Sequence, residues 1–235
     1  IIAARDMHRM HGTTRAVISL VTADLDTLMQ RTAAVAACMP DRTDILGVHL
    51  EGPFLDPGHK GAHEESLLRD PVSVAIERII AESNGVVRQI TLAPELPGGI
   101  DAIRALVAND IVAAIGHTNA DAEMTRDACD AGATLITHAF NAMPGIHHRA
   151  PGPVVAAVAD PRVYLELIAD GIHVDLDLIR MIFASAPGRV VLVTDAMAAA
   201  GSGDGSYVLG NLEVTVTDGV ARLTHGNSIA GSTLT

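Results

Sequence analysis

The sequence has no tryptophan, only 2% aromatic residues and only two cysteines among its 235 residues. With so few aromatic rings, we do not expect stacking on bases or sugar faces to dominate ligand recognition. Cys38 and Cys129 fall in helical patterns without a metal or redox spacing, so we expect small buried thiols in a reducing cytoplasm. Basic residues are also scarce. The net charge of -12 disfavours nucleic acid and anionic membranes as partners.

Long apolar runs are absent too, and no stretch approaches the eighteen or so residues that a membrane-spanning helix needs. No Gly-x-Ser-x-Gly elbow and no Cys–His arrangement occurs, so nucleophilic Ser or Cys chemistry is unsupported. What the chain does have is 49% hydrophobic residues, enough to bury a full core.

Short apolar runs rich in β-branched residues alternate with helical patterns along the chain. The alternation predicts a parallel sheet joined by crossover helices, and the near-continuous apolar runs predict a sheet covered on both faces. The expected strands are Thr14–Ser19, Ile45–Leu50, Val87–Leu92, Ile111–Ile115, Thr134–Thr137, Val163–Ile168 and Val190–Val193. The expected helices include Asp26–Met39, Asp70–Ser83, Ile100–Asn109, Asp121–Ala131 and Leu176–Ala186.

Seven such units favour an α/β fold of the (β/α)8 TIM-like barrel type, which usually takes about 250 residues, over an open sheet. We assign residues 1–235 to one such domain. Because a helical pattern at Ile1–Met10 precedes the first run, we expect the first strand and the last helix to be missing from this chain and the chain to be part of a longer polypeptide. A barrel without one strand leaves two unpaired edges. Tyr207–Leu223, with an Asp218-Gly219 turn, predicts a local hairpin.

Three metal-capable side chains follow three of these runs: Glu51, His117 and His138. Catalytic divalent sites commonly take three such ligands and leave a position for water, and barrel enzymes gather catalytic groups at the ends of their strands. His49, two residues before Glu51, shares its strand face and would support the site from one layer deeper. Taken singly, each His is more often a hydrogen-bonded core residue and Glu51 could cap a helix or lie in a loop. Their joint placement favours the metal site.

Asp195 ends the last strong run. A carboxylate there can accept a proton from a metal-bound water and deliver it to a leaving amine. The alternative is a structural cap for a helix over the following alanines. The turn-rich stretch Gly201-Ser202-Gly203-Asp204-Gly205 argues against such a helix.

A set of short motifs, each weak alone, identifies a resemblance in combination. From about Gly12 onward, the chain resembles the N-acetylglucosamine-6-phosphate deacetylase family of the amidohydrolase superfamily. The motifs are His49-Leu50-Glu51-Gly52-Pro53-Phe54, Gly61-Ala62-His63, Ala93-Pro94-Glu95, Gly116-His117-Thr118, Thr137-His138-Ala139-Phe140-Asn141-Ala142-Met143-Pro144, Ala169-Asp170-Gly171-Ile172-His173, Val193-Thr194-Asp195-Ala196 and Ile229-Ala230-Gly231-Ser232.

The resemblance implies a role for each matched residue. Glu51, His117 and His138 would hold one or two divalent ions, zinc before iron, cobalt, manganese or cadmium. Asp195 would be the general base and acid, and His63, with the metal, would polarise the acetamide carbonyl. Arg149 and His173 would face the 6-phosphate, and in relatives the arginine can come from a neighbouring subunit. The implied substrate contacts are Ala62, His63, Asn141, Ala142, Arg149, Asp170, His173, Ile229, Ala230 and Gly231.

The implied function is removal of the acetyl group from N-acetyl-D-glucosamine 6-phosphate, giving glucosamine 6-phosphate and acetate in amino-sugar catabolism and cell-wall recycling. We expect a cytoplasmic homodimer or homotetramer. Two alternatives stay open: another amidohydrolase acting on a cyclic amide, and a non-catalytic sugar-phosphate-binding protein. For His147-His148-Arg149 a solvated loop is the alternative. The family's first barrel strand and its β-sandwich are not in this chain, so the number of metal ions stays open.

Overall fold

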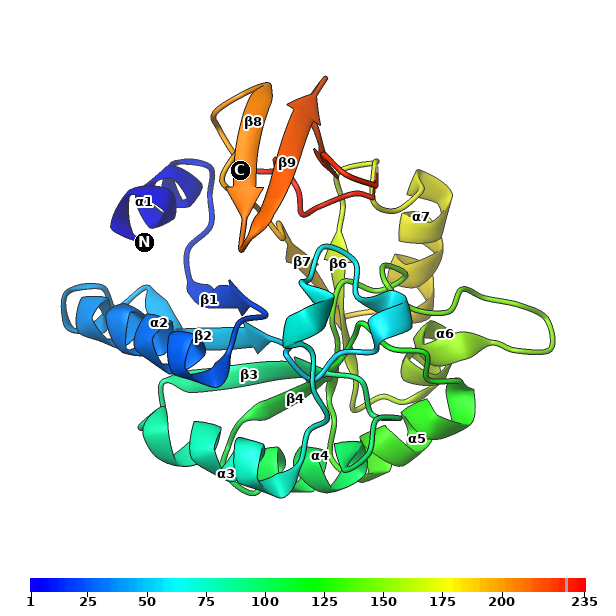
Figure 1. Cartoon of the computed structure of the whole chain (residues 1–235). Helices are drawn as coiled ribbons and strands as arrows, with labels where there is room; N and C mark the ends of the chain where they lie inside the picture. Colours follow the sequence, from blue (N-terminus) through cyan, green and yellow to red (C-terminus); the bar gives the residue numbers. More distant parts are fainter. Residues whose placement is uncertain (227) are drawn as a thin grey trace.

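The fold is built around one parallel sheet of seven strands (Figure 1). The computed structural model describes residues 1–226 and 228–235. Each strand pairs in parallel with the next along the chain, as the strand–helix alternation predicted. The strands are β1 (Ala16–Val21), β2 (Ile45–Glu51), β3 (Val87–Leu92), β4 (Val112–Ile115), β5 (Leu135–Ile136), β6 (Tyr164–Ile168) and β7 (Val190–Val193).

Helices connect these strands and lie outside the curled sheet (Figure 1). Three of them begin at an aspartate whose side chain accepts a hydrogen bond from the first turn: Asp24, Asp121 and Asp175. The helices are α1 (Ile2–Met10), α2 (Leu25–Cys38), α3 (Ser73–Glu82), α4 (Gly99–Val107), α5 (Ala122–Asp130), α6 (Gly152–Ala159) and α7 (Leu176–Ser185), with single 3-10 turns η1 (Met39–Asp41), η2 (Pro57–His59) and η3 (Glu65–Leu67).

The main hydrophobic core joins the helices to the sheet. Leu28, Ile76 and Ile103 from three helices belong to one buried cluster with strand residues such as Ile90 and Ile115. The opposite side of the sheet is polar. There, Nε2 of Gln89 on β3 donates to Oε1 of Glu166 on β6 at 3.1 Å, although these strands are not neighbours in the sheet. This bond spans the interior, so the sheet is curled like a barrel wall.

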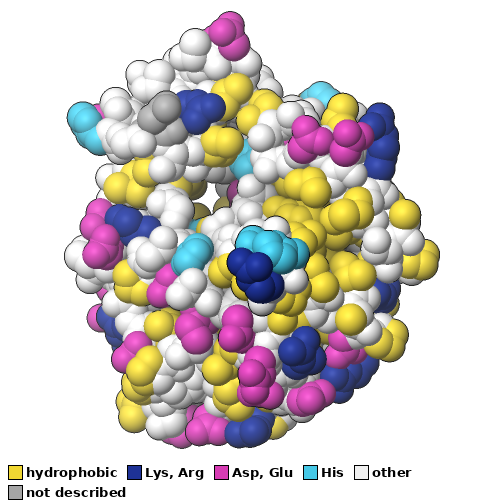
Figure 2. Space-filling model, turned by 90° about the vertical axis from the view of Figure 1, so that its right-hand side faces the viewer, with side chains coloured by type: hydrophobic (Ala, Val, Ile, Leu, Met, Phe, Trp, Pro, Cys, Tyr) yellow, Lys and Arg dark blue, Asp and Glu magenta, His cyan; other side chains and the backbone are white. Residues whose placement is uncertain are grey.

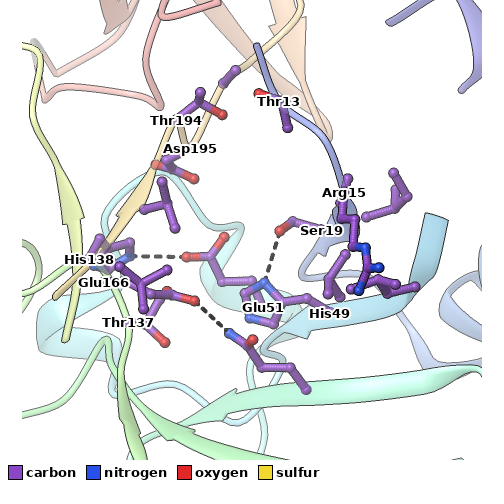
Figure 3. A pocket seen from close by; sticks show the side chains of 18 of the residues that line it. Thr13, Arg15, Ser19, His49, Glu51, Thr137, His138, Glu166, Thr194 and Asp195 are labelled. Carbon is purple, nitrogen blue, oxygen red and sulfur yellow. Dashed lines mark hydrogen bonds and ion pairs between the residues drawn. The ribbon is translucent and has the colours of Figure 1, made fainter. Parts of the chain in front are cut away.

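The curled sheet is open between its two edge strands. Within the described residues β1 and β7 each pair with one neighbour, and they do not pair with each other. A cavity of about 770 Å³ runs along this seam and reaches the site residues shown in Figure 3. Val191 and Leu192 of β7 are 40% and 62% exposed, which is unusual for a barrel strand. The prediction of a barrel short of one strand is confirmed.

A second, antiparallel sheet follows β7, and here the prediction of a single hairpin was incomplete. It has three strands, β8 (Gly205–Leu209), β9 (Leu212–Thr217) and β10 (Val220–Leu223), and its own small core that includes Val214 and Val216. The Asp218-Gly219 turn lies where expected, with φ values of 51° and 75° that suit a tight hairpin. The additional strand β8 is joined to β9 by Gly210-Asn211, a second two-residue turn.

Element ends differ from the predicted ones by up to three residues. The largest omission is α6, whose residues GPVVAAVA have no helical period. None of the helices in the described part of the chain is both long and apolar enough to cross a membrane.

Candidate active site

The four residues predicted to form the site lie at the carboxyl ends of four different strands. Glu51 is the last residue of β2, and His117, His138 and Asp195 each come two residues after β4, β5 and β7. The latter three have left-handed backbone, with φ values of 48°, 29° and 47°. Such conformations are costly outside glycine and cluster at functional sites, where the surrounding structure enforces them.

Glu51, His117 and His138 converge on one point, as predicted. Oε1 of Glu51 lies 3.1 Å from Nε2 of His117 and 3.0 Å from Nε2 of His138, and the two Nε2 atoms are 3.0 Å apart. All three side chains are buried. A tetrahedral ion with bonds of about 2.0–2.1 Å to nitrogen separates its ligand atoms by about 3.3 Å, so this cluster has the size of a metal site.

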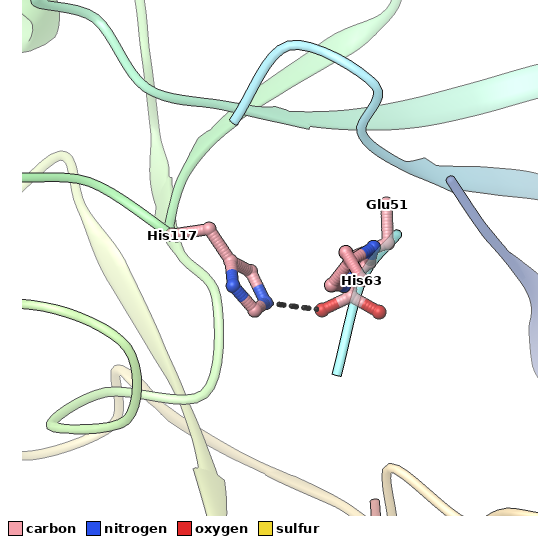
Figure 4. Close-up of side chains that lie close together, drawn as sticks. All are labelled: Glu51, His63 and His117. Atoms are coloured by element: carbon pink, nitrogen blue, oxygen red, sulfur yellow. Dashed lines mark hydrogen bonds and ion pairs between the residues drawn. The ribbon is translucent and has the colours of Figure 1, made fainter. Parts of the chain in front are cut away.

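The hydrogen bonds of His117 test whether a cation fits there. Its Nδ1 lies 2.8 Å from the carbonyl oxygen of His59, and because a carbonyl only accepts, Nδ1 must carry the hydrogen. In the neutral ring Nε2 then has a lone pair, and this lone pair faces the carboxylate of Glu51 (Figure 4). Two electron-pair donors at this distance repel unless a positive charge lies between them. A histidine anchored through one nitrogen to a carbonyl is also the usual state of a metal ligand.

A protonated His138 can supply the positive charge that the facing atoms of His117 and Glu51 require. Burial disfavours its charged form, but the hydrogen bond and the charge of Glu51 prevail and raise the pKa of His138 to about 9. The pKa of Glu51 is lowered well below its usual range, because the neighbouring His117 and His138 outweigh the effect of burial. Nδ1 of His138 is buried and has no hydrogen-bond partner within the described residues. The cluster therefore attracts positive charge, which a divalent ion would supply.

His63 belongs to the same cluster. Ligand atoms of Glu51, His63 and His117 all lie within 4.8 Å of one another, and the rings of His63 and His117 meet edge to face with centroids 4.6 Å apart (Figure 4). Nδ1 of His63 lies 2.8 Å from Oγ1 of Thr22. Burial lowers the pKa of His63 to about 3, so its ring is neutral at physiological pH. The cluster thus offers three imidazoles and one carboxylate.

Asp195 lines the seam cavity together with Glu51 and His138 (Figure 3). Burial and the negative charge of Glu51 raise its pKa to about 7, close to the value that suits a general base at neutral pH. No helix follows it: Ala196 bridges to Ser232, and the carbonyl of Asp195 accepts from the Ser232 backbone amide at 2.8 Å. The helix-cap alternative is therefore wrong, because the Asp195 carboxylate has no helix to cap.

The residues that the resemblance assigned to the substrate fall into two groups. Segment 229–231 lies beside Asp195, since a Cβ on Gly231 would come within 3.1 Å of the Asp195 carbonyl. Asn141 donates to the carbonyl of His138 at 3.2 Å, and the carbonyl of Ala142 accepts from Thr118. Ala62 precedes His63. These residues surround the cluster.

The expected phosphate contacts lie further out. Oδ2 of Asp170 binds Nδ1 of His173 at 2.6 Å, which orients that ring in the loop after β6. Arg149 is on an exposed loop, and its only described hydrogen bond runs from its backbone amide to His147. The chain by itself does not bring Arg149 into contact with the metal cluster.

Sequence reasoning found His49 but missed several neighbours. His49 contacts Oγ of Ser19 at 2.9 Å and Oγ1 of Thr91 at 2.7 Å, beneath Glu51 as expected. Thr22 and Glu166 were not predicted. Thr22 directly follows β1, so the rule that barrel enzymes carry functional groups at strand ends could have found it. Glu166 lies within an apolar strand, where a charged residue signals a polar barrel interior.

The fold and the cluster define the class: a parallel β/α-barrel domain with a candidate metal centre at the carboxyl ends of its strands. Comparison with known proteins narrows this class to a smaller group of enzymes. The chain is 42% identical over 217 residues to N-acetylgalactosamine-6-phosphate deacetylase of Escherichia coli O157:H7, covering 91% of this chain and 57% of that protein. It is 40% identical over 227 residues to N-acetylglucosamine-6-phosphate deacetylase of Vibrio furnissii, covering 95% and 57%.

Solved structures agree. N-acetyl-D-glucosamine-6-phosphate deacetylase of Mycobacterium smegmatis superposes with a TM-score of 0.93 and 46% identity over 97% of this chain and 61% of that one. A variant of that protein, solved in complex with N-acetyl-D-glucosamine-6-phosphate, gives a TM-score of 0.94. No protein-family model matches the chain. The chain thus spans about 60% of the length of these relatives, and its resemblance to the N-acetylglucosamine-6-phosphate deacetylases is confirmed over nearly all of its own length.

Proposed function

We propose that this chain carries the catalytic centre of a metal-dependent deacetylase that converts N-acetyl-D-glucosamine 6-phosphate into glucosamine 6-phosphate and acetate. The observation that carries the proposal is the lone pair of His117 facing Glu51 beside His138, an arrangement that calls for a cation. The named relatives and the TM-score of 0.94 to a substrate complex support it. We assign residues 1–235 to the barrel domain of such an enzyme, and zinc is our first choice of ion because imidazole and carboxylate suit it.

Each group of the site has its own part in the proposed hydrolysis. A bound divalent cation would lower the pKa of water toward neutrality and polarise the acetyl carbonyl. Asp195 accepts a proton from the attacking water and then delivers that proton to the departing C2 amine. His63 lies beside Glu51 and His117 in the cluster, where it would contact the acetyl group, and the 229–231 backbone would hold the sugar next to Asp195.

We propose that Arg149 and His173 bind the 6-phosphate. A guanidinium offers a planar pair of donors that matches phosphate oxygens, which lets an acidic protein hold a dianion locally. Asp170 fixes the His173 ring at 2.6 Å and thereby aims its other nitrogen. Arg149 is exposed on its loop, which is consistent with a guanidinium that completes the site of a second subunit.

We further propose a homodimer formed through α7 and the neighbouring loop. Helix α7 buries only Ile182 and exposes Leu176 (56%), Met181 (38%) and Phe183 (47%). On this side of the molecule, hydrophobic side chains gather beside a protruding group of histidine and basic side chains (Figure 2). Contiguous apolar surface of this kind commonly marks a protein interface. Sedimentation equilibrium of wild type and Phe183→Asp tests it: a dimer that dissociates in the variant is expected, and a monomeric wild type would contradict it.

A second candidate substrate has a specific observation in its favour. The relative from Escherichia coli O157:H7 is named for the galactosamine epimer, and its identity of 42% lies between the 40% and 46% found for the glucosamine enzymes of Vibrio furnissii and Mycobacterium smegmatis. The two sugars differ only at C4, away from the acetamide. The comparisons favour neither a cyclic-amide hydrolase nor a non-catalytic binding protein. The cytoplasm remains our proposed location, since amino-sugar phosphates are intracellular metabolites.

Acetate release tests the proposal. The purified protein is assayed with N-acetylglucosamine 6-phosphate, its galactosamine epimer and unphosphorylated N-acetylglucosamine, before and after chelation and after zinc is restored. We expect turnover of a phosphorylated sugar that chelation abolishes and zinc restores. Equal turnover of the unphosphorylated sugar would contradict the phosphate site, and insensitivity to chelation would contradict the metal.

A further inference from the structure

Glu95 belongs to the Ala93-Pro94-Glu95 motif and takes no direct part in the proposed hydrolysis. It lies in the loop after β3, and both oxygens of its carboxylate contact the segment that follows β4. Oε2 accepts from the hydroxyl of Thr118 at 2.5 Å, and Oε1 accepts from the backbone amide of Asn119 at 2.5 Å. These two residues come directly after His117. Glu95 therefore joins the loops at the ends of two neighbouring strands.

The segment that Glu95 holds begins beside a strained residue. His117 has φ 48°, a left-handed conformation that is unfavourable outside glycine and persists only where the surrounding contacts enforce it. Nδ1 of its ring lies 2.8 Å from the carbonyl oxygen of His59, and its own backbone carbonyl accepts from the amide of Asp56 at 2.9 Å. Both of these contacts come from the loop after β2. Glu95 fixes the chain on the other side of His117.

The backbone that carries Glu95 is itself held in place. The amide of Ala93 donates to the carbonyl of Phe54 at 2.8 Å, and both Ala93 and Pro94 are buried. The start of α4 packs closely on the same segment, since a Cβ on Gly99 would come within 2.3 Å of the Pro94 carbonyl oxygen. A carboxylate on so fixed a backbone can determine the position of the groups that it contacts.

A carboxylate is also chemically suited to this task. Hydrogen bonds to a charged acceptor are shorter and roughly twice as strong as those between neutral groups. The two oxygens of Glu95 accept from consecutive residues, so they fix the orientation of the Thr118–Asn119 segment as well as its position. Oγ1 of Thr118 in turn accepts from the amide of Ala120 at 2.9 Å. The turn after His117 is thus built around the Glu95 carboxylate.

The same turn reaches the loop that follows His138. The backbone amide of Thr118 donates to the carbonyl of Ala142 at 3.1 Å. Ala142 also has left-handed backbone, with φ 51°. The turn that Glu95 fixes therefore connects the two strand ends that supply His117 and His138.

We infer that Glu95 is a positioning residue: its carboxylate holds the turn at Thr118 and Asn119, so that His117 keeps the left-handed backbone that directs its ring toward Glu51 and His138. The inference deepens the proposed function and rests on it for the presence of a cation at this cluster. Glu95 acts on the cluster through the backbone of His117.

Amide hydrogen exchange of the metal-free protein, followed by nuclear magnetic resonance, tests the contact itself. Asn119 is an exposed residue, so its amide should exchange quickly unless the Glu95 carboxylate protects it. We expect slow exchange in wild type and fast exchange in Glu95→Ala. An Asn119 amide that exchanges equally fast in both proteins would overturn the inference.

Zinc affinity, measured in competition with a chromophoric chelator, tests whether the contact matters for the cluster. We expect Glu95→Ala to weaken binding by about 10-fold, the lower end of the loss typical when a partner that orients a metal ligand is removed, because Glu95 contacts the residues after His117. Asp121→Ala is the matched control, since it removes another carboxylate that accepts from backbone amides in the loop after β4, those of Glu123 and Met124. Both variants should lose stability, but only Glu95→Ala should lose affinity. Unchanged affinity in Glu95→Ala, or an equal loss in both variants, would overturn the inference.

Thr118 provides a conservative pair of variants and a double-mutant cycle. Thr118→Ser keeps the hydroxyl that donates to Glu95 and should bind zinc as wild type does, whereas Thr118→Val keeps the shape and should lose part of the affinity. In Thr118→Val, the added Glu95→Ala change should cost less than it does in wild type, because both changes remove the same contact. Fully independent losses would contradict the inference. None of these measurements requires turnover, so a protein that shows these affinities but releases no acetate would contradict the proposed function and leave this inference intact.

Discussion

Nε2 of His117 lies 3.1 Å from Oε1 of Glu51, although Nδ1 of the same ring already donates its hydrogen to the carbonyl of His59 at 2.8 Å. The two facing atoms are both electron-pair donors. Their closeness is the central feature of this site, since it calls for positive charge at the point where His138 also converges.

Asp195→Asn should lower kcat by about 10²–10⁴-fold, the usual contribution of a positioned general base. The amide keeps the size of the carboxylate and cannot accept the proton. Zinc affinity should stay within a few-fold of wild type, because Asp195 is not among the converging ligands. Steady-state kinetics and chelator competition measure both quantities. Asp101→Asn, whose side chain is exposed on α4, is the control. Unchanged kcat would remove Asp195 from the mechanism.

The same variant should change how the stability of the metal-free protein depends on pH. The folded-state pKa of Asp195 is about 7 against 3.8 in the unfolded chain, so the folded state holds one more proton between these values. The free energy of unfolding therefore falls as pH rises through this window, by up to about 1.4 kcal/mol per pH unit, and levels off above it. Urea unfolding at several pH values should show a shallower decline for Asp195→Asn. Parallel curves for the two proteins would contradict the raised pKa.

Arg149→Ala should raise KM for the phosphorylated sugar by about 10–100-fold, since a hydrogen bond to a charged group contributes about 1.5–3 kcal/mol. Turnover at saturation should change little, and any turnover of the unphosphorylated sugar should not change. Arg162→Ala is the matched control. Arg162 precedes β6 at the opposite end of the strand and pairs with Asp160 and Asp130. An equal loss with both sugars would show that Arg149 does not recognise phosphate.

Thr32→Val should stabilise the protein by roughly 1 kcal/mol. Thr32 in α2 is 3% exposed, and its hydroxyl has no hydrogen-bond partner within the described residues. Valine has nearly the same shape and similar helix propensity, so the change removes a buried unpaired polar group at little other cost. Thr125→Val serves as the opposite case, because that hydroxyl is bonded at 2.6 Å, and it should destabilise. Denaturant unfolding measures both.

The strand order and the convergence of Glu51, His117 and His138 could be predicted because they depend on short apolar runs and on the residues that end them. Val87–Leu92 and Val190–Val193 have the predicted bounds, and the second run lies directly between the polar residues Arg189 and Thr194. Helix α6 could not be found in this way. Its sequence, GPVVAAVA, is apolar on every side and begins beside two prolines, so it has no amphipathic period. Tertiary packing, with five buried residues, holds this helix in place.

The proton positions could not be predicted at all. They depend on contacts between distant segments, such as His117 with His59 and His63 with Thr22, and neither contact leaves a periodic or compositional trace. His59 illustrates the difficulty, because its role lies in its backbone carbonyl and any residue would supply one. Sequence patterns located the candidate ligands, whereas the structure shows which polar groups their nitrogens contact.

Elemental analysis of Glu51→Gln after dialysis against buffer with trace zinc tests the central claim most directly. Glutamine keeps the shape of Glu51 and removes the charge that His117 and His138 share. Wild type should retain at least one equivalent of divalent ion, and Glu51→Gln should retain almost none. The control Glu82→Gln, whose side chain is exposed on α3, should behave like wild type. Equal metal content in wild type and Glu51→Gln would contradict the account.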